Sequence, residues 1–551
     1  MDAVNLSIFA NRIDAICGEM GITLQKSAFS PNIRDRLDYS CAIFDAHGEL
    51  CAQAAHIPVH LGSMAFAMRD LTKMFDWVAG DMVVVNDPYK GGTHLPDVTI
   101  IAPLFITNEI AGFVVNRAHH ADIGSETPGS MPLSSSLFEE GLVIEPTFIV
   151  KNDEIEEVFF AGLMGSMRNP QESAGDFIAQ IAANRRGLSR LLALIKKMGI
   201  DVYRDGLDEL NHYAAMLSKK SLADIADGRY TFEDVMDDDG MGNVAIPMKV
   251  AITFLNNTIT VDFADTAAQV KGNINCPLSV TAAAVYYVFR CLMPAQTPAC
   301  AGSFQNINIV APQSSVVNAS YPAAVAAGNV ETSTRIVDLI LGALAKAIPE
   351  RIPAASHGSM NNLAMGHAGG GVGEENNSAW DYYETIGGGM GASSVSEGLD
   401  GVQTHMTNTL NTPIESLEMK YPIRVNRYQI RKDSAGKGAF DGGEGLIREY
   451  EFLSSAQVTI LSERRSQRPW GLSITKQTID KGVTDRQLVD EGSAIQHGNV
   501  AFCRTRLAAR SGSNQLNGKP LAAKQSFEVS AGDVVTISTA GGGAYDPCQS
   551  A

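Results

Sequence analysis

The sequence predicts an α+β fold with extensive β-sheet, several long helices and a β-rich C-terminal region. The first observation is the helical spacing of apolar residues in 4–23 and the long stretch of helix-forming residues in 173–220. The second is a series of short apolar segments separated by Gly and Pro turns in 40–150 and 229–265, and the third is the strand-like character of 415–540. Together these helical and strand-like stretches predict the α+β class.

Two more helices and three glycine clusters complete the expected order of elements. The segments 277–293 and 331–348 are predicted helices, the second with Thr332 or Ser333 as its N-cap. The glycine clusters lie between aromatic and β-branched segments, where glycine is better explained by turns and close backbone approaches than by a linker. They occupy 369–371, 387–389 and 541–543.

The length of the chain predicts more than one packed region. It has 551 residues, of which 45% are hydrophobic, and a single core rarely grows beyond about 250–300 residues. We expect an N-terminal α+β region over 1–225, a central α+β region over 226–415 and a β-rich C-terminal region over 416–551.

Composition excludes several classes of protein. The net charge of −18 opposes binding to a phosphate backbone, so no nucleic-acid partner is expected. None of the eight cysteines forms a CxxC pair, which argues against a zinc knuckle. The N-terminus lacks the basic and apolar pattern of a secretory signal, and no apolar run approaches the roughly 20 residues of a membrane helix. We therefore expect a cytoplasmic protein without a membrane partner.

The most informative stretch predicts a β-hairpin. Val98–Ile106 and Ala111–His119 are apolar strands, and the segment between them contains Asn108 and Glu109. Neighbouring strands lie roughly 4.7–4.9 Å apart, so side chains at the open end of the hairpin can share one ion. That open end gathers His94, Asp97, His119, His120 and Asp122.

The pairing of the hairpin depends on where it turns. A turn centred between Asn108 and Glu109 places Asp97 opposite His120. A slip of one residue exchanges the inward roles of His119 and His120, because side chains alternate along a strand. The sequence alone leaves open which of the two histidines is the ligand.

The residue types at this open end point to a divalent metal. His94 and Asp97 flank Leu95-Pro96, and the proline favours a turn that directs both side chains to one side. Two imidazoles and a carboxylate suit Zn or Mn, and open positions on the ion indicate a catalytic site. His120 and Asp122 are then the expected catalytic groups, as outer contacts or proton carriers. The alternative is a set of hydrogen-bonded structural side chains.

Two other segments leave alternatives open. His56 and His60 are a second candidate ligand pair, but Pro58 between them favours a loop, where they have a substrate-side or structural role. The segment 463–471 (ERRSQRPWG) gathers three arginines beside Trp470. It either binds an anion or a partner subunit or is a solvated charged loop.

Missing motifs limit what the chain does by itself. It has no GxxxxGK[ST] phosphate loop, no GxSxG nucleophile elbow, and no GxGxxG that follows a strand and opens a helix. If the reaction uses ATP, another chain binds it.

The polar stretch 404–418 is a candidate wall of the substrate cleft.

Several motifs resemble one protein family, the hydantoinase B/oxoprolinase family, which includes B subunits of ATP-dependent hydantoinases and the acetone and acetophenone carboxylases. The similarity runs from about residue 34 to 450 and includes the TAGGGAYDP ending, and its combination of HLPD with HHAD is specific. The matching segments are RDRLDYSCAIFDAHGEL, PVHLGSM, GDMVVVNDPYKGGTHLPDVTIIAPLF, RAHHADIG, GDFIAQIAANRRG, GNVETSTRIVD, THMTNTLNTPIESLE and FDGGEGLIREYEF.

This resemblance implies a set of ligands and a partner. In the family, a companion A subunit with an actin-like ATPase fold uses ATP to activate the substrate or bicarbonate, and the B-type subunit hosts the metal. The ligands that correspond in this chain are His94, Asp97 and His119. The resemblance also implies a hetero-oligomer, with A2B2 as one arrangement.

We therefore expect the metal-bearing subunit of an ATP-dependent cyclic-amide hydrolase that opens a hydantoin, 5-oxoproline or lactam ring. Two alternatives stay open: a subunit of an ATP-dependent ketone carboxylase, and a non-catalytic scaffold for the ATPase subunit. The acetone carboxylase subunits of this type are much longer than this chain, which favours the hydrolase.

Overall fold

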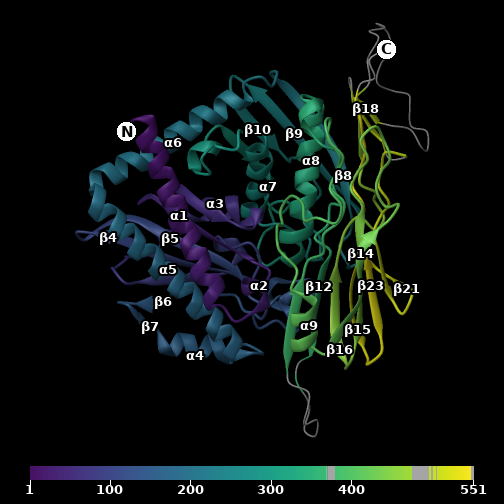
Figure 1. The fold of residues 1–551 in the computed structure, drawn as a ribbon, viewed down its shortest axis with the longest axis horizontal. Helices are drawn as coiled ribbons and strands as arrows, with labels where there is room; N and C mark the ends of the chain where they lie inside the picture. The colour runs from purple at the N-terminus through teal and green to yellow at the C-terminus, as the bar shows by residue number, and fades with distance from the viewer. Residues whose placement is uncertain (368, 370–378, 475–494, 498–499, 504–505, 548–551) are drawn as a thin grey trace.

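The computed structural model confirms the α+β class (Figure 1). Helices and strands are mixed in the N-terminal and central parts of the chain, and strands dominate the C-terminal part. The structure describes all residues except 368, 370–378, 475–494, 498–499, 504–505 and 548–551.

A seven-stranded antiparallel sheet carries the predicted hairpin at its centre. Its strand order is β2-β1-β5-β4-β3-β6-β7, so the hairpin strands β4 and β5 have a neighbour on both sides. The strands are β1 (Tyr39–Phe44), β2 (Leu50–Ala55), β3 (Met82–Val85), β4 (Asp97–Ile106), β5 (Glu109–His119), β6 (Thr147–Lys151) and β7 (Glu154–Ile155).

Helices cover both faces of this sheet. α1 (Ala3–Ser27) and α5 (Pro170–Met198) pack on one face with Val98 and Ile100, whereas α3 (Pro58–Leu71) packs on the other face. Successive strand residues point to opposite faces, which explains why both faces need an apolar cover. The sheet is therefore buried on both sides.

The predicted helix over 173–220 is two helices. α5 begins after Asn169, whose side chain accepts a hydrogen bond from the backbone of Glu172. It ends at Gly199, which has φ +90°, and α6 (Ile200–Leu222) follows at once. A residue with positive φ cannot continue a right-handed helix, and glycine is the residue that adopts this conformation at little cost.

The central region contains a four-stranded sheet and two buried helices. The sheet has the order β11-β10-β9-β8, and α7 (Leu278–Cys291) and α8 (Ser333–Ala345) lie in the same apolar core. Its strands are β8 (Gly228–Asp238), β9 (Val244–Leu255), β10 (Thr258–Asp262) and β11 (Ile307–Val310).

The expected N-cap of α8 is wrong. A single π-helical turn, Gly328–Thr332, precedes α8 without a break, and both Thr332 and Ser333 have helical backbone angles. No side-chain cap is needed, because the preceding turn already satisfies the first amides of α8. This π-helical turn matters below, because it carries Asn329 and Glu331.

The C-terminal part consists of three smaller sheets, as predicted for 415–540, although 475–494 lies outside the described residues. Their orders are β13-β12-β16-β22, β14-β15-β23-β20-β21 and β18-β19-β17-β24. The strands are β12 (Asn362–His367), β13 (Trp380–Glu384), β14 (Ile423–Arg431), β15 (Gly445–Phe452), β16 (Ala456–Leu461), β17 (Gly471–Ile474), β18 (Ile495–His497), β19 (Val500–Cys503), β20 (Ser513–Leu516), β21 (Lys519–Leu521), β22 (Lys524–Val529), β23 (Val534–Ser538) and β24 (Tyr545–Asp546).

Short helices complete the fold. The α-helical ones are α2 (Pro31–Arg34), α4 (Glu157–Gly165) and α9 (Ile414–Lys420). The 3-10 turns are η1 (Pro88–Lys90), η2 (Pro128–Ser130), η3 (Leu137–Glu139), η4 (Ala301–Phe304) and η6 (Pro349–Arg351).

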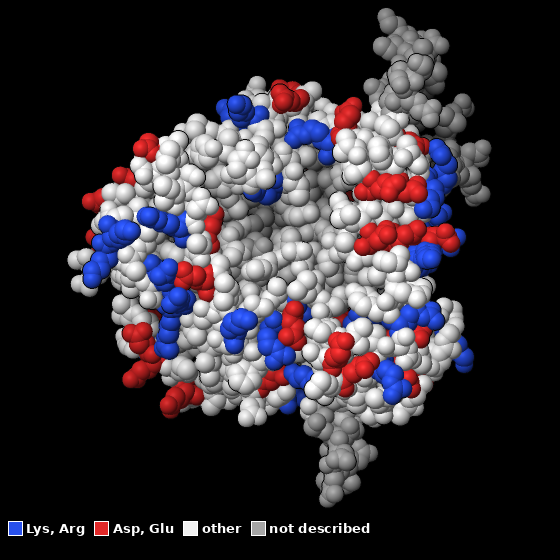
Figure 2. Space-filling view, viewed as in Figure 1, with Lys and Arg blue, Asp and Glu red and all other residues white. Residues whose placement is uncertain are grey.

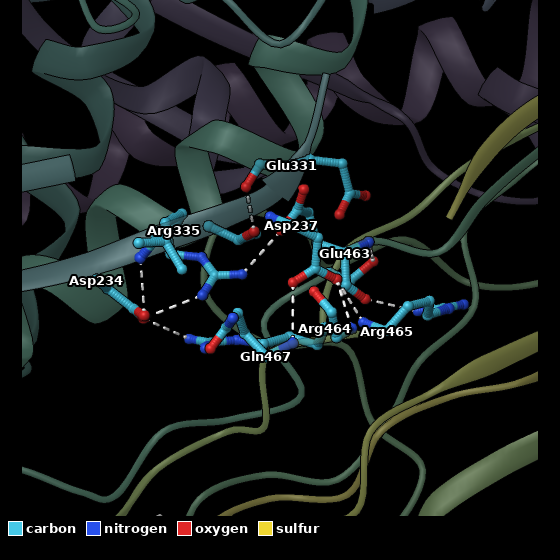
Figure 3. A network of polar contacts seen from close by, with 12 residues as sticks. Asp234, Asp237, Glu331, Arg335, Glu463, Arg464, Arg465 and Gln467 are labelled. Atoms are coloured by element: carbon cyan, nitrogen blue, oxygen red, sulfur yellow. Dashed lines mark hydrogen bonds and ion pairs between the residues drawn. The ribbon is translucent and has the colours of Figure 1, made fainter. Parts of the chain in front are cut away.

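The segment 463–471 is solvated only in part: Arg468 is exposed, whereas Arg464 is buried. Arg464 is 1% exposed, and its guanidinium lies 2.6 Å from Asp338 on α8. Arg335, fully buried on α8, lies 3.0 Å from Asp234 of β8 and 3.0 Å from Glu463 (Figure 3). Arg464 and Arg335 can be buried because carboxylates pair with both of them. This network joins the central helix to the C-terminal strands.

Charges of both signs are interspersed over the face shown in Figure 2. Figure 2 shows a hollow near the middle of one face, and the visible lining of this hollow is mostly uncharged. None of the helices in the described part of the chain combines the length and the apolar character needed to cross a bilayer.

Candidate metal centre

The candidate centre lies at the open end of the β4–β5 hairpin. Asp97 pairs directly with His119, so the side chains of the two residues project to the same side of the sheet. The expected pairing of Asp97 with His120 is therefore wrong by one residue. The slip that the sequence left open has occurred, and it directs His119 rather than His120 toward Asp97.

Two local features of the hairpin cause this register. The turn lies at Thr107 and Asn108, which have φ +50° and +67°, one position earlier than expected. The pairing then shifts once more between Leu104 and Phe105, a β-bulge. Neither feature changes the hydrophobic pattern of the strands, so the pattern could not reveal them.

A tight loop brings His94 to the same place. Gly91 has φ +107°, and a Cβ there would lie 2.6 Å from the Cβ of Ala67 on α3. The carbonyl of Gly91 accepts a hydrogen bond from Arg117 at 2.9 Å. Glycine is required here by both its backbone angle and the space available.

Three side chains converge at this point. The ligand atoms of His94, Asp97 and His119 all lie within 4.8 Å of one another, and the residues are 0–2% exposed. His94 Nε2 lies 3.2 Å from Asp97 Oδ2. Within the part of the chain that the structure describes, no other group of three His, Cys, Asp or Glu residues meets this distance criterion.

The unpartnered atoms of these residues fit a metal ion. His94 Nε2, Asp97 Oδ1 and His119 Nε2 are all buried and lack a hydrogen-bond partner. Buried polar atoms without a partner are rare because their desolvation is not repaid. These three residues, whose ligand atoms lie within 4.8 Å of one another, offer two nitrogen atoms and one carboxylate oxygen, the donor set that Zn and Mn accept.

The second oxygen of Asp97 is occupied by the protein itself. Asp97 Oδ2 accepts hydrogen bonds from Thr93 Oγ1 at 2.6 Å and from Asn329 Nδ2 at 3.2 Å. His60 Nε2 lies 3.4 Å from the same oxygen. These groups fix the carboxylate so that Oδ1 is left free, which is how outer contacts orient a metal ligand.

The far sides of the two histidine rings are also held. His94 Nδ1 lies 3.3 Å from the carbonyl of Ala326, to which a protonated Nδ1 donates, so an ion would bind at Nε2 once that nitrogen carries no proton. His119 Nδ1 lies 3.2 Å from Asn32 Nδ2. Binding of an ion at His119 Nε2 requires the amide of Asn32 to turn its oxygen toward the ring, so that Nδ1 donates to it.

The electrostatics of the cluster keep Asp97 charged and His119 neutral. Burial by itself raises the pKa of Asp97, but His94 and His60 outweigh it, so the pKa lies well below its usual range. Burial, and then the neighbouring His94, lower the pKa of His119 well below its usual range. A carboxylate and a neutral imidazole are the protonation states that bind metals.

The two predicted catalytic residues make other contacts. His120 Nε2 lies 2.9 Å from Gln180 Oε1 on α5, and the His120 ring packs on Phe177. Asp122 accepts hydrogen bonds from the backbone amides of Gly124, Arg168 and Asn169, which fix the start of α5. Neither joins the group formed by His94, Asp97 and His119, and their catalytic roles stay predictions.

His60 lies closer to the candidate centre than its sequence context indicates. Pro58 is the first residue of α3 rather than part of a loop, because proline fits the first turn of a helix. His60 therefore lies on the first turn of α3, 1% exposed, beside Asp97. His56 precedes the helix, and its ring packs on Tyr39. The two histidines do not form a ligand pair.

Comparison of this chain with known proteins shows which family it belongs to. The model of the family described as hydantoinase B/oxoprolinase matches residues 2–547. The chain belongs to the hydantoinase B/oxoprolinase family. An uncharacterised family member from Methanocaldococcus jannaschii is 38% identical over 551 residues, which cover 99% of this chain and 91% of that protein.

Other hydantoinase B/oxoprolinase relatives are longer. 5-Oxoprolinase 1 of Arabidopsis thaliana is 38% identical over 501 residues, which cover 86% of this chain but 38% of the plant protein. The crystal structure of the ATP-dependent caprolactamase from Pseudomonas jessenii matches with a TM-score of 0.85 and 24% identity, covering 99% of this chain and 91% of that chain. The caprolactamase therefore shares the fold.

Proposed function

We propose that the chain is the metal-bearing subunit of an ATP-dependent hydrolase that opens a cyclic amide, such as a hydantoin, 5-oxoproline or a lactam. The observation that carries this proposal is the set of three buried, unpartnered ligand atoms on His94, Asp97 and His119. Membership of the hydantoinase B/oxoprolinase family supports the reaction class.

The residues of the proposed centre have two kinds of role: some would bind the ion and others orient a ligand. His94 Nε2, Asp97 Oδ1 and His119 Nε2 would hold a divalent ion, Zn or Mn. Such an ion supplies Lewis acidity, which polarises a carbonyl and acidifies a water. His60, Thr93 and Asn329 orient the carboxylate of Asp97.

ATP enters the proposal through a partner. An unstrained amide is a poor electrophile, and phosphorylation of its oxygen would make the carbon more electrophilic. Water could then add to this carbon, the ring C–N bond could break, and hydrolysis of the resulting acyl phosphate would release phosphate. The sequence contains no phosphate-binding loop, so we assign ATP binding to an ATPase-type A subunit in a hetero-oligomer. The 5-oxoprolinases that this chain matches are longer chains, of which it spans 36–42%.

The test uses the chain co-expressed with its ATPase-type partner. The complex is given ATP and a panel containing hydantoin, 5-oxoproline and caprolactam, and its metal content is measured. We expect bound Zn or Mn and ring opening that depends on ATP. His94→Ala should lose both, whereas His212→Ala, at an exposed position of α6, should lose neither.

Two outcomes would contradict the proposal. If the His94→Ala complex opens the ring at the rate of the unaltered complex, the metal role is wrong. If isotopically labelled bicarbonate appears in the product with a ketone substrate, the protein is a carboxylase subunit instead of a hydrolase subunit.

A further inference from the structure

The ring of His119 is stacked on an aromatic residue from the other half of the chain. Tyr383 lies on β13, in a different sheet from His119 on β5. The two ring centroids are 4.6 Å apart and the ring planes differ by 4°. Both side chains are at most 2% exposed. The stack is therefore a dry contact between two regions that are far apart in the sequence.

Arg36 lies against the ring of Tyr383. Its guanidinium lies 4.8 Å from the centre of the tyrosine ring, within the range of a cation–π contact. It also donates hydrogen bonds to the carbonyl of Tyr383 at 2.9 Å and to Thr385 Oγ1 at 3.1 Å. Arg36 is fully buried, so these contacts have little competition from water.

The hydroxyl of Tyr383 is fixed at the other end. It donates to Asn362 Oδ1 at 2.6 Å, and Asn362 Nδ2 donates to Glu331 Oε1 at 2.8 Å. Glu331 lies on the same π-helical turn as Asn329, which contacts Asp97. Tyr383 is thus held at its backbone and ring by Arg36 and at its hydroxyl by Asn362, and its ring is stacked on His119.

We propose that Tyr383 is a positioning residue for the metal centre: its ring, held by Arg36 and Asn362, fixes the plane of His119 so that Nε2 faces the other two ligand atoms. The torsion that rotates an imidazole about its Cβ–Cγ bond has broad minima, and a parallel aromatic face restricts it. This inference rests on the proposed metal site and deepens it.

Tyr382 provides a matched control on the same strand. It is also 1% exposed, but it points to the opposite face of β13, where its ring packs on Tyr421 and its hydroxyl donates to Glu384. Loss of either tyrosine removes a buried aromatic side chain from β13. Loss of Tyr383 alone removes the stack on His119.

The experiment compares Tyr383→Leu, Tyr383→Phe and Tyr382→Leu in the full-length chain. The Zn²⁺ dissociation constant is measured by competition with a chromogenic chelator, and the visible spectrum of the Co²⁺-loaded chain reports ligand geometry. We expect Tyr383→Leu to weaken Zn²⁺ binding by about 10- to 100-fold and to change the Co²⁺ spectrum. Tyr383→Phe keeps the ring and its contact with Arg36 but loses the hydrogen bond to Asn362, so its effect should be smaller than that of Tyr383→Leu. Tyr382→Leu should resemble the unaltered chain.

Three results would overturn the inference. If Tyr383→Leu binds Zn²⁺ as tightly as the unaltered chain, the positioning role of Tyr383 is wrong, but the proposed function is unaffected. The same holds if Tyr382→Leu loses as much Zn²⁺ affinity as Tyr383→Leu. An unaltered chain that takes up no divalent ion overturns both this inference and the proposed function. If Tyr383→Leu does not fold, Tyr383→Met replaces it, because methionine fills the space with a flexible chain and no ring plane.

Discussion

Asp97 and His119 face each other directly across β4 and β5, and this pairing brings together two candidate ligands that are far apart along the hairpin. A strand pair holds facing residues at a fixed separation. Little conformational entropy is therefore lost when the two side chains are aligned to bind a metal ion. His94 joins them from the adjoining loop, only three residues before Asp97. The predictions below test the groups that surround this pair.

Replacement of His60 should weaken metal binding without removing a ligand. His60 Nε2 lies 3.4 Å from Asp97 Oδ2, whereas Asp97 Oδ1 has no hydrogen-bond partner. Without it, the carboxylate is held less firmly, and outer contacts of this kind are typically worth about 10- to 100-fold in affinity. We expect this loss for His60→Ala in a Zn²⁺ competition assay. His56→Ala, which removes a ring that packs on Tyr39, should bind Zn²⁺ normally; equal losses would assign both effects to loosening of the segment.

Gly91→Ala should destabilise the fold. The backbone at Gly91 has φ +107°, and the added methyl would lie 2.6 Å from Ala67 Cβ. Strain of this kind costs roughly 1–3 kcal/mol, which would appear as a lower midpoint in urea unfolding. Gly18→Ala is the opposite case, since Gly18 lies within α1 with open space around it. It should stabilise the chain by about 0.5–1 kcal/mol. If Gly91→Ala left the midpoint of urea unfolding unchanged, the loop would be able to shift and accommodate the added methyl group.

Arg335→Met should be among the most damaging substitutions outside the centre. It leaves Asp234 and Glu463, both 3.0 Å away, without one of their cationic partners in a buried site. Breaking a buried ion pair typically costs about 3–5 kcal/mol. Arg186→Met removes an exposed ion pair with Glu19, and should change the free energy of unfolding by about 0.5 kcal/mol or less. Similar effects for the two variants would mean that the network contributes no more than a surface pair.

His357 should make the protein sensitive to acid. Burial, with a smaller contribution from His405, lowers the pKa of His357 to about 3. The unfolded chain binds a proton at this position below about pH 6.5 and the folded chain does not, so stability is lost as the pH falls from 6.5 toward 3. In urea unfolding, His357→Phe should lose less stability between pH 7 and pH 5 than the unaltered chain. His212→Phe, at an exposed position, should follow the unaltered chain. An unchanged pH slope for His357→Phe would contradict the assignment.

The sequence predicted the hairpin well and its pairing poorly. Apolar segments around Asn108 defined both strands of the hairpin, because burial on both faces leaves a continuous apolar pattern. The pairing was wrong because the turn at Thr107 and the bulge after Leu104 shift the partner strand while leaving that pattern unchanged. The resemblance to the family, rather than the predicted pairing, selected His119 as the ligand.

Other misjudged residues have partners far away in the sequence. Arg464 was expected in a charged loop, but it is buried because Asp338, 126 residues earlier, pairs with it. The side chain of Tyr383 contacts His119 from another sheet, and no motif near either residue indicates this contact. The sequence around Pro58 favours a loop and so a substrate-side or structural role for His60. In the structure Pro58 begins a helix instead.

By itself, the sequence determined the kinds of secondary structure, the family and the candidate ligands His94, Asp97 and His119, because these depend on local periodicity and on short motifs. Only the tertiary structure decided which histidine faces Asp97, which oxygen of that carboxylate stays free, and that Tyr383 lies against His119. Strand register and contacts between distant segments are settled by the packing of the whole chain, and such packing leaves no local pattern in the sequence.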